Sequence, residues 1–516
     1  MKLQYIAILI AGVSLGTGCK KGLLDLYPEG NIASGNFFRN TGDFQMAVVG
    51  AYVPLRNIAD QAYYMDEMRA DNTHYEFNAK DRGGAGFEQL GDFTDNAQNG
   101  VTGARYNHAY SGIHRCNTIL DRLEKIKFSM DEKDKKQITG EAKALRAHYY
   151  FDLVRHFGKV PLPLHELLST DPKQVFLPRT SVDSVYNQIV ADFTDALSLL
   201  EAPEVPSSGR MNKAVVACEL GLVYITRKQW DKAVPLLQSV TGMKYDLLPN
   251  YRDNFDPAKK GTNKEAIFEV QYKSGTDGQQ SIYPYRFMPV TDSSKAMLDI
   301  EFNNQNGGWN TPTADLMRQY EADDKRMNAS IGFFEGYVGS NGVFKVEKLV
   351  TEDARTYVTP PGKTSRVFIK KYYFYPYKIP AYNTDQNWPV FRLGGVLLLL
   401  AEALNENNQS SEALAPLNRV RQRAGLLTPI SNTDQAQLRD IIAKEQRLEL
   451  AFENYRWPDL VRTGKAAQVM TAHGLEMKSL YGYLSADAYN VTEKKYIYPI
   501  PAREMQQNPT WTQNDY

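Results

Sequence analysis

Apolar residues recur every three or four positions between residues 391 and 464, where the helical pattern is densest. The apolar positions of the first helix there share one face, and they are Leu393, Val396, Leu397, Leu400 and Leu404. After a short polar loop, a second helix continues through Leu417 and Val420 until Gly425 ends it. Because the loop is so short, we predict that the two helices lie antiparallel.

A third helix is predicted to pack on this hairpin, and Glu445 lies on its apolar face. The apolar positions of that face are Leu438, Ile441, Ile442, Leu448 and Phe452. An unpaired buried charge is costly, so Glu445 needs a cationic partner. The candidates are Arg419, Arg421, Arg423 and Arg456. We interpret Glu445 as part of a structural ion pair, with a catalytic acid as the alternative. Trp457-Pro458 is predicted to end the helix, because helical backbone is disfavoured before proline.

Helical periodicity also covers four earlier stretches, at residues 41–57, 104–126, 130–156 and 182–200. Two further stretches carry the spacings of the tetratricopeptide pattern, in which small residues let paired helices approach. Their residues are Ala217, Leu220, Gly221, Tyr224, Ala233 and Leu237, then Leu400, Ala401, Leu404, Ala413 and Leu417. We therefore predict a mainly α fold, a tetratricopeptide-like right-handed solenoid of about four helix pairs.

Residues 246–389 interrupt this pattern and are predicted to form a large loop-rich insertion with short strands. The segments AIFEVQY and RVFIKKYYFY are typical of strands. Residues 59–102 are also predicted as a loop, and a loop of that length is usually functional or disordered. The tail beyond residue 480 is irregular but rich in aromatic residues, so we expect it to fold back onto the body.

The chain starts with a short basic segment and an apolar run from Leu3 to Val13, which is too short to span a bilayer. The small residues that follow resemble a bacterial lipobox ending at Cys19. We predict a signal peptide at residues 1–18 and a lipid anchor on Cys19, with ordinary secretion as the alternative. The mature chain is then divided into three regions: 19–245, 246–389 and 390–516.

Composition narrows the classes of partner. Lys+Arg and Asp+Glu number 60 each, and the basic residues form no cluster, so nucleic acid is not an expected partner. Many of the 32 tyrosines lie in irregular stretches, which suits a binding surface because the ring offers a flat apolar face. The alternative is that these rings fix loops to the body. Cys116 and Cys218 fall in helical patterns and are predicted to be buried thiols.

The usual catalytic patterns are absent from the sequence. The seven histidines form no H-E-x-x-H motif, and no cysteine pair has zinc-ligand spacing. We predict no catalytic residue, metal site or cofactor. A glycosidase needs only two carboxyl groups across a cleft, and that arrangement cannot be read from sequence alone.

Five segments, in order, resemble the SusD/RagB group of outer-membrane nutrient-uptake lipoproteins of the Bacteroidetes. They are the cysteine followed by LLDLYP, EAKALRAHYYFDLVRHFGKVPL, VLLLLAEALNE with LNRVRQRAGL, EQRLELAFENYRWPDLVRTG and YPIPAREMQQNPTWTQNDY. The resemblance implies a non-enzymatic, lipid-anchored protein of the outer membrane that faces the cell surface. It would bind a glycan or other nutrient and pass it to a SusC-like TonB-dependent β-barrel. The alternatives are a surface glycan hydrolase and a tetratricopeptide scaffold for protein partners.

The resemblance also implies where a sugar binds, namely on loops outside the repeats, largely by stacking on aromatic rings. In this chain, residues 59–102 and 261–312 supply such loops. The aromatic platforms predicted from position and residue type are Tyr75, Phe93, Tyr283, Tyr285 and Trp309. The predicted polar partners are Asp71, Asn72 and Asn96.

Overall fold

The computed structural model describes residues 37–516, apart from 78–83, 170, 172–174, 205–208, 300–301, 353, 375–381 and 432–433. The predicted signal peptide and the predicted anchor on Cys19 lie outside the described residues.

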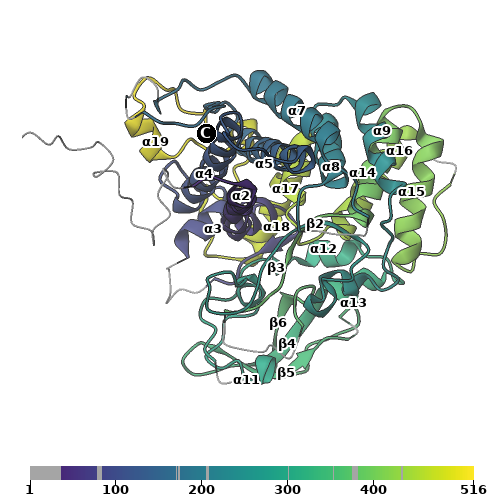
Figure 1. Cartoon of the computed structure of the whole chain (residues 1–516). Coiled ribbons are helices and arrows are strands. Elements are labelled where there is room, and N and C mark those ends of the chain that lie inside the picture. Colours follow the sequence, from purple (N-terminus) through teal and green to yellow (C-terminus); the bar gives the residue numbers. More distant parts are fainter. Residues whose placement is uncertain are drawn as a thin grey trace, which may run out of the picture.

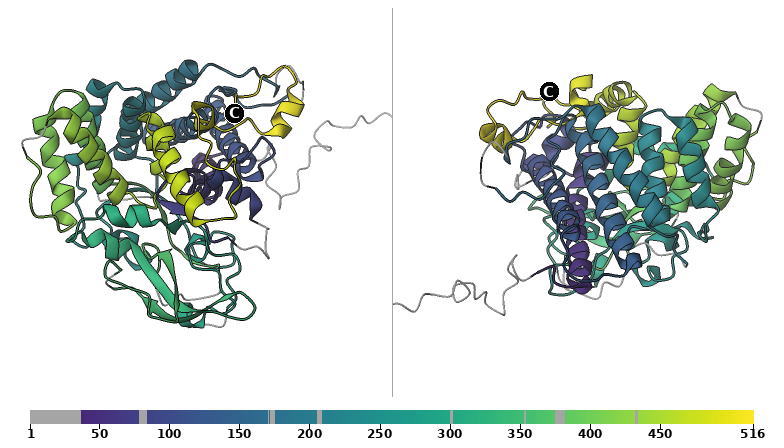
Figure 2. Two further views of the ribbon diagram at one scale, coloured as in Figure 1. Left: turned by 180° about the vertical axis from the view of Figure 1, so that it is seen from behind. Right: turned by 45° about the horizontal axis from the view of Figure 1, so that its top comes forward.

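Pairs of antiparallel helices stand side by side and form the body of the molecule (Figures 1 and 2). The four pairs are α2 (Thr41–Ala62) with α4 (Gly100–Leu123), α5 (Glu132–Phe157) with α7 (Val182–Leu199), α8 (Lys213–Thr226) with α9 (Trp230–Thr241), and α14 (Leu393–Glu406) with α15 (Ser410–Arg423). A further helix, α16 (Gln435–Glu449), packs on α14. The predicted mainly α, tetratricopeptide-like array of about four helix pairs is confirmed, and the predicted helices are present with ends shifted by a few residues.

Small residues lie at the contacts between helices, as the repeat pattern predicts. A Cβ atom on Gly221 of α8 would stand 2.9 Å from Cδ2 of Leu237 on α9. This separation is shorter than ordinary carbon–carbon contact, so the crossing of α8 and α9 requires glycine. Cys116 and Cys218 are free and buried in the helices α4 and α8, which confirms the prediction of buried thiols.

The segment between α9 and α14 carries most of the strands. β2 (Ala266–Val270) pairs antiparallel with β7 (Trp388–Arg392), so the two ends of the insertion lie side by side. β4 (Ile331–Val338) is the central strand of a three-stranded sheet, with β5 (Phe344–Val350) and β6 (Thr364–Ile369) on its two sides. Figure 1 shows this sheet below the helices. AIFEVQY contains the whole of β2, and RVFIKKYYFY contains the second part of β6, so both segments include strand residues as predicted. The boundaries of the three regions stay predictions.

Short helices complete the fold. Those of the insertion are η3 (Tyr251–Phe255), η4 (Pro257–Lys259), α10 (Tyr283–Arg286), α11 (Lys295–Leu298), α12 (Ala314–Gln319) and α13 (Lys325–Ser330). Those of the C-terminal region are α17 (Arg456–Arg462), α18 (Ala466–Leu480), η5 (Glu493–Tyr496) and α19 (Ala502–Gln507).

The prediction that residues 59–102 form one loop is wrong. Helix α2 continues as a π-helical turn, η2 (Tyr63–Glu67), which is followed by β1 (Thr73–His74) and α3 (Ala85–Asp92). All residues of η2 are buried. The residues of this stretch are ordered because they are buried against segments that are distant in the sequence. Burial of that kind produces no helical periodicity, so the sequence pattern did not indicate it.

The end of the third hairpin helix also differs from the prediction. Helix α16 stops at Glu449, and Phe452 has a positive φ of 69°. Pro458 lies in the first turn of α17. The first backbone N–H groups of a helix have no partner within it, so proline costs little at that position. The Trp457-Pro458 pair therefore starts a helix here and does not terminate one.

Glu445 is part of an ion pair, as interpreted from the sequence. It is 2.9 Å from Nη1 of Arg421, one of the four candidates, and 2.6 Å from Nη2 of Arg326 in the insertion. The remaining candidates bind other carboxylates: Arg419 binds Asp246, Arg423 binds Glu265, and Arg456 binds Asp71. The pairs of Glu445 tie α15, α16 and the insertion together, and the Arg456–Asp71 pair ties α17 to the segment after η2.

The C-terminal tail folds back onto the body, as predicted. The Tyr498 hydroxyl donates to the carbonyl oxygen of Met65 at 2.8 Å. The Tyr516 hydroxyl accepts from Arg69 at 2.8 Å and donates to Asp95 at 2.5 Å. The last residue of the chain is thus held against the loop that follows η2.

Asp60, near the end of α2, gives the fold a dependence on pH. Burial raises the pKa of Asp60 from 3.8 to about 7, although the Tyr272 hydroxyl and Arg286 favour the charged form. The folded state therefore keeps a proton that the unfolded state releases, and stability falls as pH rises from about 4 to 7. We expect Asp60→Asn to be more stable than the parent at pH 8 and nearly equal to it at pH 4, measured by urea unfolding.

The matched control is Asp277→Asn, because Asp277 is an exposed aspartate in the same chain. Its stability curve should parallel that of the parent at both pH values. A constant difference between Asp60→Asn and the parent across this range would contradict the role assigned to Asp60.

Candidate functional site

Four aromatic rings from opposite ends of the chain form a stack, which we call the aromatic stack: His74, Phe77, Tyr481 and Tyr483. The rings of Phe77 and Tyr483 are 4.1 Å apart and nearly parallel, at 10°. Tyr481 stacks on His74 at 4.8 Å and on Tyr483 at 5.4 Å. His74 is buried, whereas Phe77, Tyr481 and Tyr483 are partly exposed. The stack therefore reaches the surface.

Backbone pairing brings these segments together. β1 pairs with β3 (Thr311–Pro312), with His74 opposite Thr311. The backbone N–H of Glu76 then donates to Gly308 at 2.7 Å. Helix α18 ends at Leu480, and the chain after it returns so that the backbone N–H of Tyr489 donates to the backbone carbonyl oxygen of Asp92 at 2.8 Å. Tyr481 and Tyr483 lie in this returning segment.

His74 fixes the orientation of two tyrosines. Its Nε2 is 2.8 Å from the Tyr483 hydroxyl, and its Nδ1 is 3.1 Å from the Tyr489 hydroxyl. Burial, with a smaller effect of His473, lowers the pKa of His74 to about 3. A neutral imidazole has one donor and one acceptor nitrogen, so one tyrosine donates to the ring and the other accepts from it. Within the stack, this arrangement fixes Tyr483 relative to His74.

An ion pair lies beside the stack. Arg366 of β6 donates through Nη1 to Oε2 of Glu76 at 2.6 Å, and the backbone N–H of Val290 donates to the same oxygen. Burial raises the pKa of Glu76, and Arg366 partly offsets this effect. Burial and the charge of Glu76 raise the pKa of Tyr481, which places the pair electrostatically close to that ring. The side chain of Arg366 is 28% exposed, so it can reach a ligand.

Two of the five predicted platforms lie behind the stack. The rings of Tyr75 and Trp309 are 6.2 Å apart, and Tyr75 also contacts His74 and Tyr483. Tyr75 is 3% exposed and Trp309 is 9% exposed. Neither ring offers a free face to solvent, so both support the stack instead of forming its outer surface.

The other three predicted platforms are not exposed rings in this structure. Phe93 packs on Trp457 and under the guanidinium of Arg69. Tyr283 packs edge-on against Trp388, and Tyr285 belongs to a separate core with Phe302. All three are buried: Phe93 in the core around Trp457, Tyr283 in the main core that includes the helices, and Tyr285 in the core of the insertion.

The predicted polar partners have different surroundings. Asp71 is buried and bound by Arg456 and Arg447, which hold its pKa well below the usual range although burial alone would raise it. The Asn72 amide donates to Glu67 at 3.0 Å. Asn96 is exposed and its side chain accepts from the N–H of Gln98. Asp71 and Asn72 are thus structural, and Asn96 alone of the three is open to solvent.

Sequence reasoning missed Phe77, Tyr481, Tyr483 and the Glu76–Arg366 pair. One signal was present, since Tyr481-Gly482-Tyr483 places two rings around a glycine directly after a helix. Their proximity to Phe77, however, follows from the return of the C-terminal chain, which no local pattern predicts.

The position of Trp309 depends on a glycine. A Cβ atom on Gly84 would stand 2.4 Å from Cη2 of Trp309, so Gly84→Ala must displace the indole ring. We expect a loss of about 1–3 kcal/mol in the free energy of unfolding, because overpacking of a buried contact is destabilising. Urea unfolding measures the loss, and tryptophan fluorescence reports the movement of the ring.

Gly86→Ala is the matched control, because its Cβ would come no closer than 3.8 Å to Asn99 Nδ2. It lies in α3, where alanine is the better helix former, so stability should be equal or slightly higher. Equal effects of the two substitutions would contradict the packing of Trp309 on Gly84.

Comparison with known proteins identifies the family. Residues 264–516 match the model of the SusD family. Residues 41–225 match a second model, described as starch-binding and associating with the outer membrane. The chain belongs to the SusD/RagB family. Among the described residues, no helix combines the length and apolar character needed to cross a bilayer.

The similarity of this SusD-family chain to its relatives covers all or nearly all of its length. It is 27% identical to SusD-like protein P2 of Formosa agariphila, over 100% of this chain and 99% of the relative. It is 26% identical to SusD-like protein P38 of the same organism, over 97% of both chains.

Solved structures share the fold. A laminarin-binding SusD-like protein is 26% identical, with a TM-score of 0.70 over 92% of this chain and 99% of that one. Surface glycan-binding protein A from Bacteroides thetaiotaomicron is 23% identical, with a TM-score of 0.73 over 93% and 100% of the two chains. This second likeness concerns the fold alone.

Proposed function

We propose that the protein is a non-enzymatic, lipid-anchored glycan-binding subunit that captures an oligosaccharide on the aromatic stack. It then delivers the oligosaccharide to a SusC-like, TonB-dependent transporter in the outer membrane. The observation that carries the binding site is the stack itself, where three partly exposed rings lie beside an ion pair with an accessible guanidinium.

The chemistry of the stack suits a sugar. A pyranose ring has an apolar face of C–H groups that lies on an aromatic ring, while its hydroxyls need donors and acceptors at the edge. Tyr481 and Tyr483 offer ring and hydroxyl, and Arg366 offers donors. Because His74 and the Phe77 contact already fix the rings, little conformational entropy is lost on binding.

The ligand class to test first is a β-glucan. The 26% identical solved structure is described as laminarin-binding, and this supports laminarin and its oligosaccharides as the first probes. Starch oligosaccharides are the second class, because the N-terminal segment matches a family described as starch-binding.

Calorimetric titration of the purified protein, from residue 20 onward, against laminarihexaose, maltohexaose and a mucin-type glycan tests the binding function. We expect one of these to bind without release of new reducing ends. Release of reducing ends would favour a glycan hydrolase instead. Absence of binding to every glycan would favour the tetratricopeptide scaffold for protein partners.

The transporter link needs a separate test. We expect an affinity-tagged protein, purified from detergent-solubilised outer membranes, to bring down a large β-barrel in near-equal amount. Recovery of the protein without a barrel, under conditions that preserve other membrane complexes, would contradict the delivery step but not glycan binding.

A further inference from the structure

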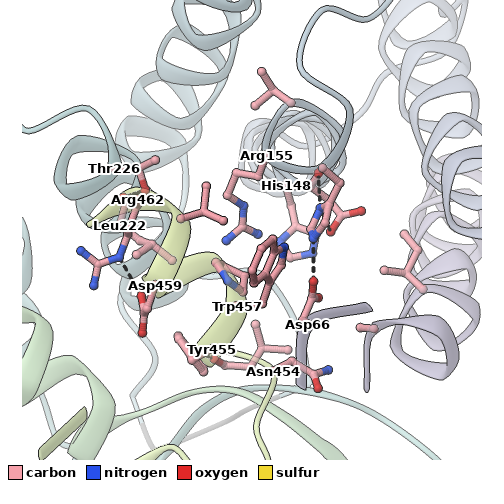
Figure 3. Close-up of a pocket in the computed structure, with 18 of the residues that line it drawn as sticks. Asp66, His148, Arg155, Leu222, Thr226, Asn454, Tyr455, Trp457, Asp459 and Arg462 are labelled. Carbon is pink, nitrogen blue, oxygen red and sulfur yellow. Dashed lines mark hydrogen bonds and ion pairs between the residues drawn. The ribbon is translucent and has the colours of Figure 1, made fainter. Parts of the chain in front are cut away.

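A cavity of about 370 Å³ lies apart from the aromatic stack, on the inner side of the helix pairs. Helices α2, α5, α7 and α8 form one wall, and β7 and α17 form the other (Figure 3). Most of its lining is apolar, including Leu55, Ile58, Tyr186, Leu222, Trp388 and Trp457. Its volume is within the range of sites that hold small molecules.

Arg155 is the first polar group that this cavity offers to a ligand. Its guanidinium lies 4.0 Å over the Phe151 ring, and its Nε donates to the Phe151 carbonyl at 3.2 Å. These contacts hold the side chain in place but use neither Nη atom. Figure 3 shows Arg155 directed into the cavity above Trp457. Among the described residues, no carboxylate lies within ion-pair distance of Arg155, but its charge adds to those of Arg105 and His156 in lowering the pKa of Asp152.

Asn454 is the second polar group of the cavity without a partner. Neither its Oδ1 nor its Nδ2 has a hydrogen-bond partner among the described residues, although both atoms are out of reach of solvent. Its backbone is fixed, because φ is 67° and its N–H donates to Oε2 of Glu67 at 3.0 Å. An amide left unpaired in this way costs stability, and a ligand recovers that cost once the Asn454 side chain turns its amide into the cavity.

The carboxylates of the wall, in contrast, already have partners. Asp66 and Asp152 bind Arg105, Glu219 binds His148, Glu453 binds Arg392, and Asp459 binds Arg462. The groups left for a ligand are therefore the Arg155 guanidinium and the Asn454 amide, next to an apolar surface.

We propose that this cavity is a second binding site, for a small amphipathic carboxylate. The apolar part of such a molecule lies against Leu222 and Trp457, its carboxylate accepts from the Nη atoms of Arg155, and an amide or hydroxyl pairs with Asn454. Guanidinium–carboxylate bonds are charge-assisted and bidentate, so Arg155 determines the charge that the site accepts. This site is separate from the proposed glycan surface and does not depend on it.

N-acetyl-L-phenylalanine is the first probe, because it carries a carboxylate, an amide and an apolar ring. Its neutral matched control is N-acetyl-L-phenylalaninamide. By calorimetric titration at pH 7, we expect the carboxylate to bind and the neutral amide to bind at least about tenfold more weakly. N-acetyl-L-leucine and phenylacetate extend the panel to a smaller apolar group and to a ligand without an amide.

Two substitutions in the chain assign the contacts. Arg155→Gln should remove the preference for the carboxylate, whereas Arg155→Lys should retain part of it. Asn454→Gly, which suits the positive φ, should weaken both N-acetylated probes but not phenylacetate. Arg503→Gln, an exposed arginine of α19, is the matched control and should change nothing. Thermal unfolding confirms that each variant is folded.

The proposal is overturned if none of the three carboxylates binds at millimolar concentration. It is also overturned if folded Arg155→Gln binds N-acetyl-L-phenylalanine as the parent does. Replacing Tyr481 and Tyr483 should leave this binding unchanged, so failure of the glycan surface and failure of this site can be told apart.

Discussion

Glu449→Ala is expected to lower the free energy of unfolding by about 3–5 kcal/mol, because it leaves buried arginines without their carboxylate. Glu449 is 0% exposed. It accepts from Nη1 of Arg326 at 3.0 Å and forms short ion pairs with Arg392 and Arg423. Burial alone would raise its pKa, but the three guanidinium groups hold the pKa well below the usual range.

The same pKa sets the pH at which this stabilisation is lost. A carboxylate with a depressed pKa in the folded state stabilises the protein above the unfolded pKa of about 4.5, and the effect disappears as pH falls toward the folded value. The difference between Glu449→Ala and the parent should therefore shrink below pH 4.

Urea unfolding at pH 7 measures the loss, and Glu412→Ala is the control. Glu412 is an exposed glutamate of α15, where alanine favours the helix, so its removal should change stability by less than about 0.5 kcal/mol. Equal stability of the two variants would show that the buried network does not hold α16 against the insertion.

Replacing Tyr481 and Tyr483 together with alanine is expected to weaken glycan binding by about tenfold or more. Each aromatic contact contributes about 0.5–1.5 kcal/mol beyond the burial of area, and 1.4 kcal/mol corresponds to a factor of ten. Both rings are partly exposed, so the loss of stability should be smaller than the loss of affinity. Calorimetric titration with the glycan that the parent binds gives the change.

Tyr337→Ala is the matched control for the aromatic stack. Tyr337 is 42% exposed on β4, outside the stack, so its replacement should leave the affinity unchanged. If the double variant binds as tightly as the parent, the aromatic stack is not the glycan surface.

Periodicity was enough to predict the helical body. Each helix packs against a neighbour through the residues that make up its sequence pattern. These are the apolar faces of α14 and α16 and the small residues of α8, so the pattern alone predicts the packing. The helix end near Trp457-Pro458 could not be predicted in this way. There the break comes from the backbone turn at Phe452 and Asn454, where Glu67, far away in the chain, accepts from both N–H groups.

The candidate site was harder to predict, because exposure is a tertiary property. Tyr283 and Tyr285 lie in a segment that the sequence predicts as loop, where a binding residue is expected, yet Tyr283 fills the main core and Tyr285 the core of the insertion. The rings of Phe77 and Tyr483 lie 4.1 Å apart, although the two residues are far apart in the sequence. His74 and Tyr483, which share a hydrogen bond, are separated by 409 positions. That the site is aromatic stays a prediction from the sequence, and only the fold shows which rings reach the surface.

A crystal structure of the protein with the bound oligosaccharide tests the central claim most directly. We predict a pyranose ring against Tyr481 and Tyr483, with a hydroxyl within hydrogen-bond distance of Arg366. A sugar bound elsewhere, for example in the cavity beside α17, with the aromatic stack uncovered, would contradict the account.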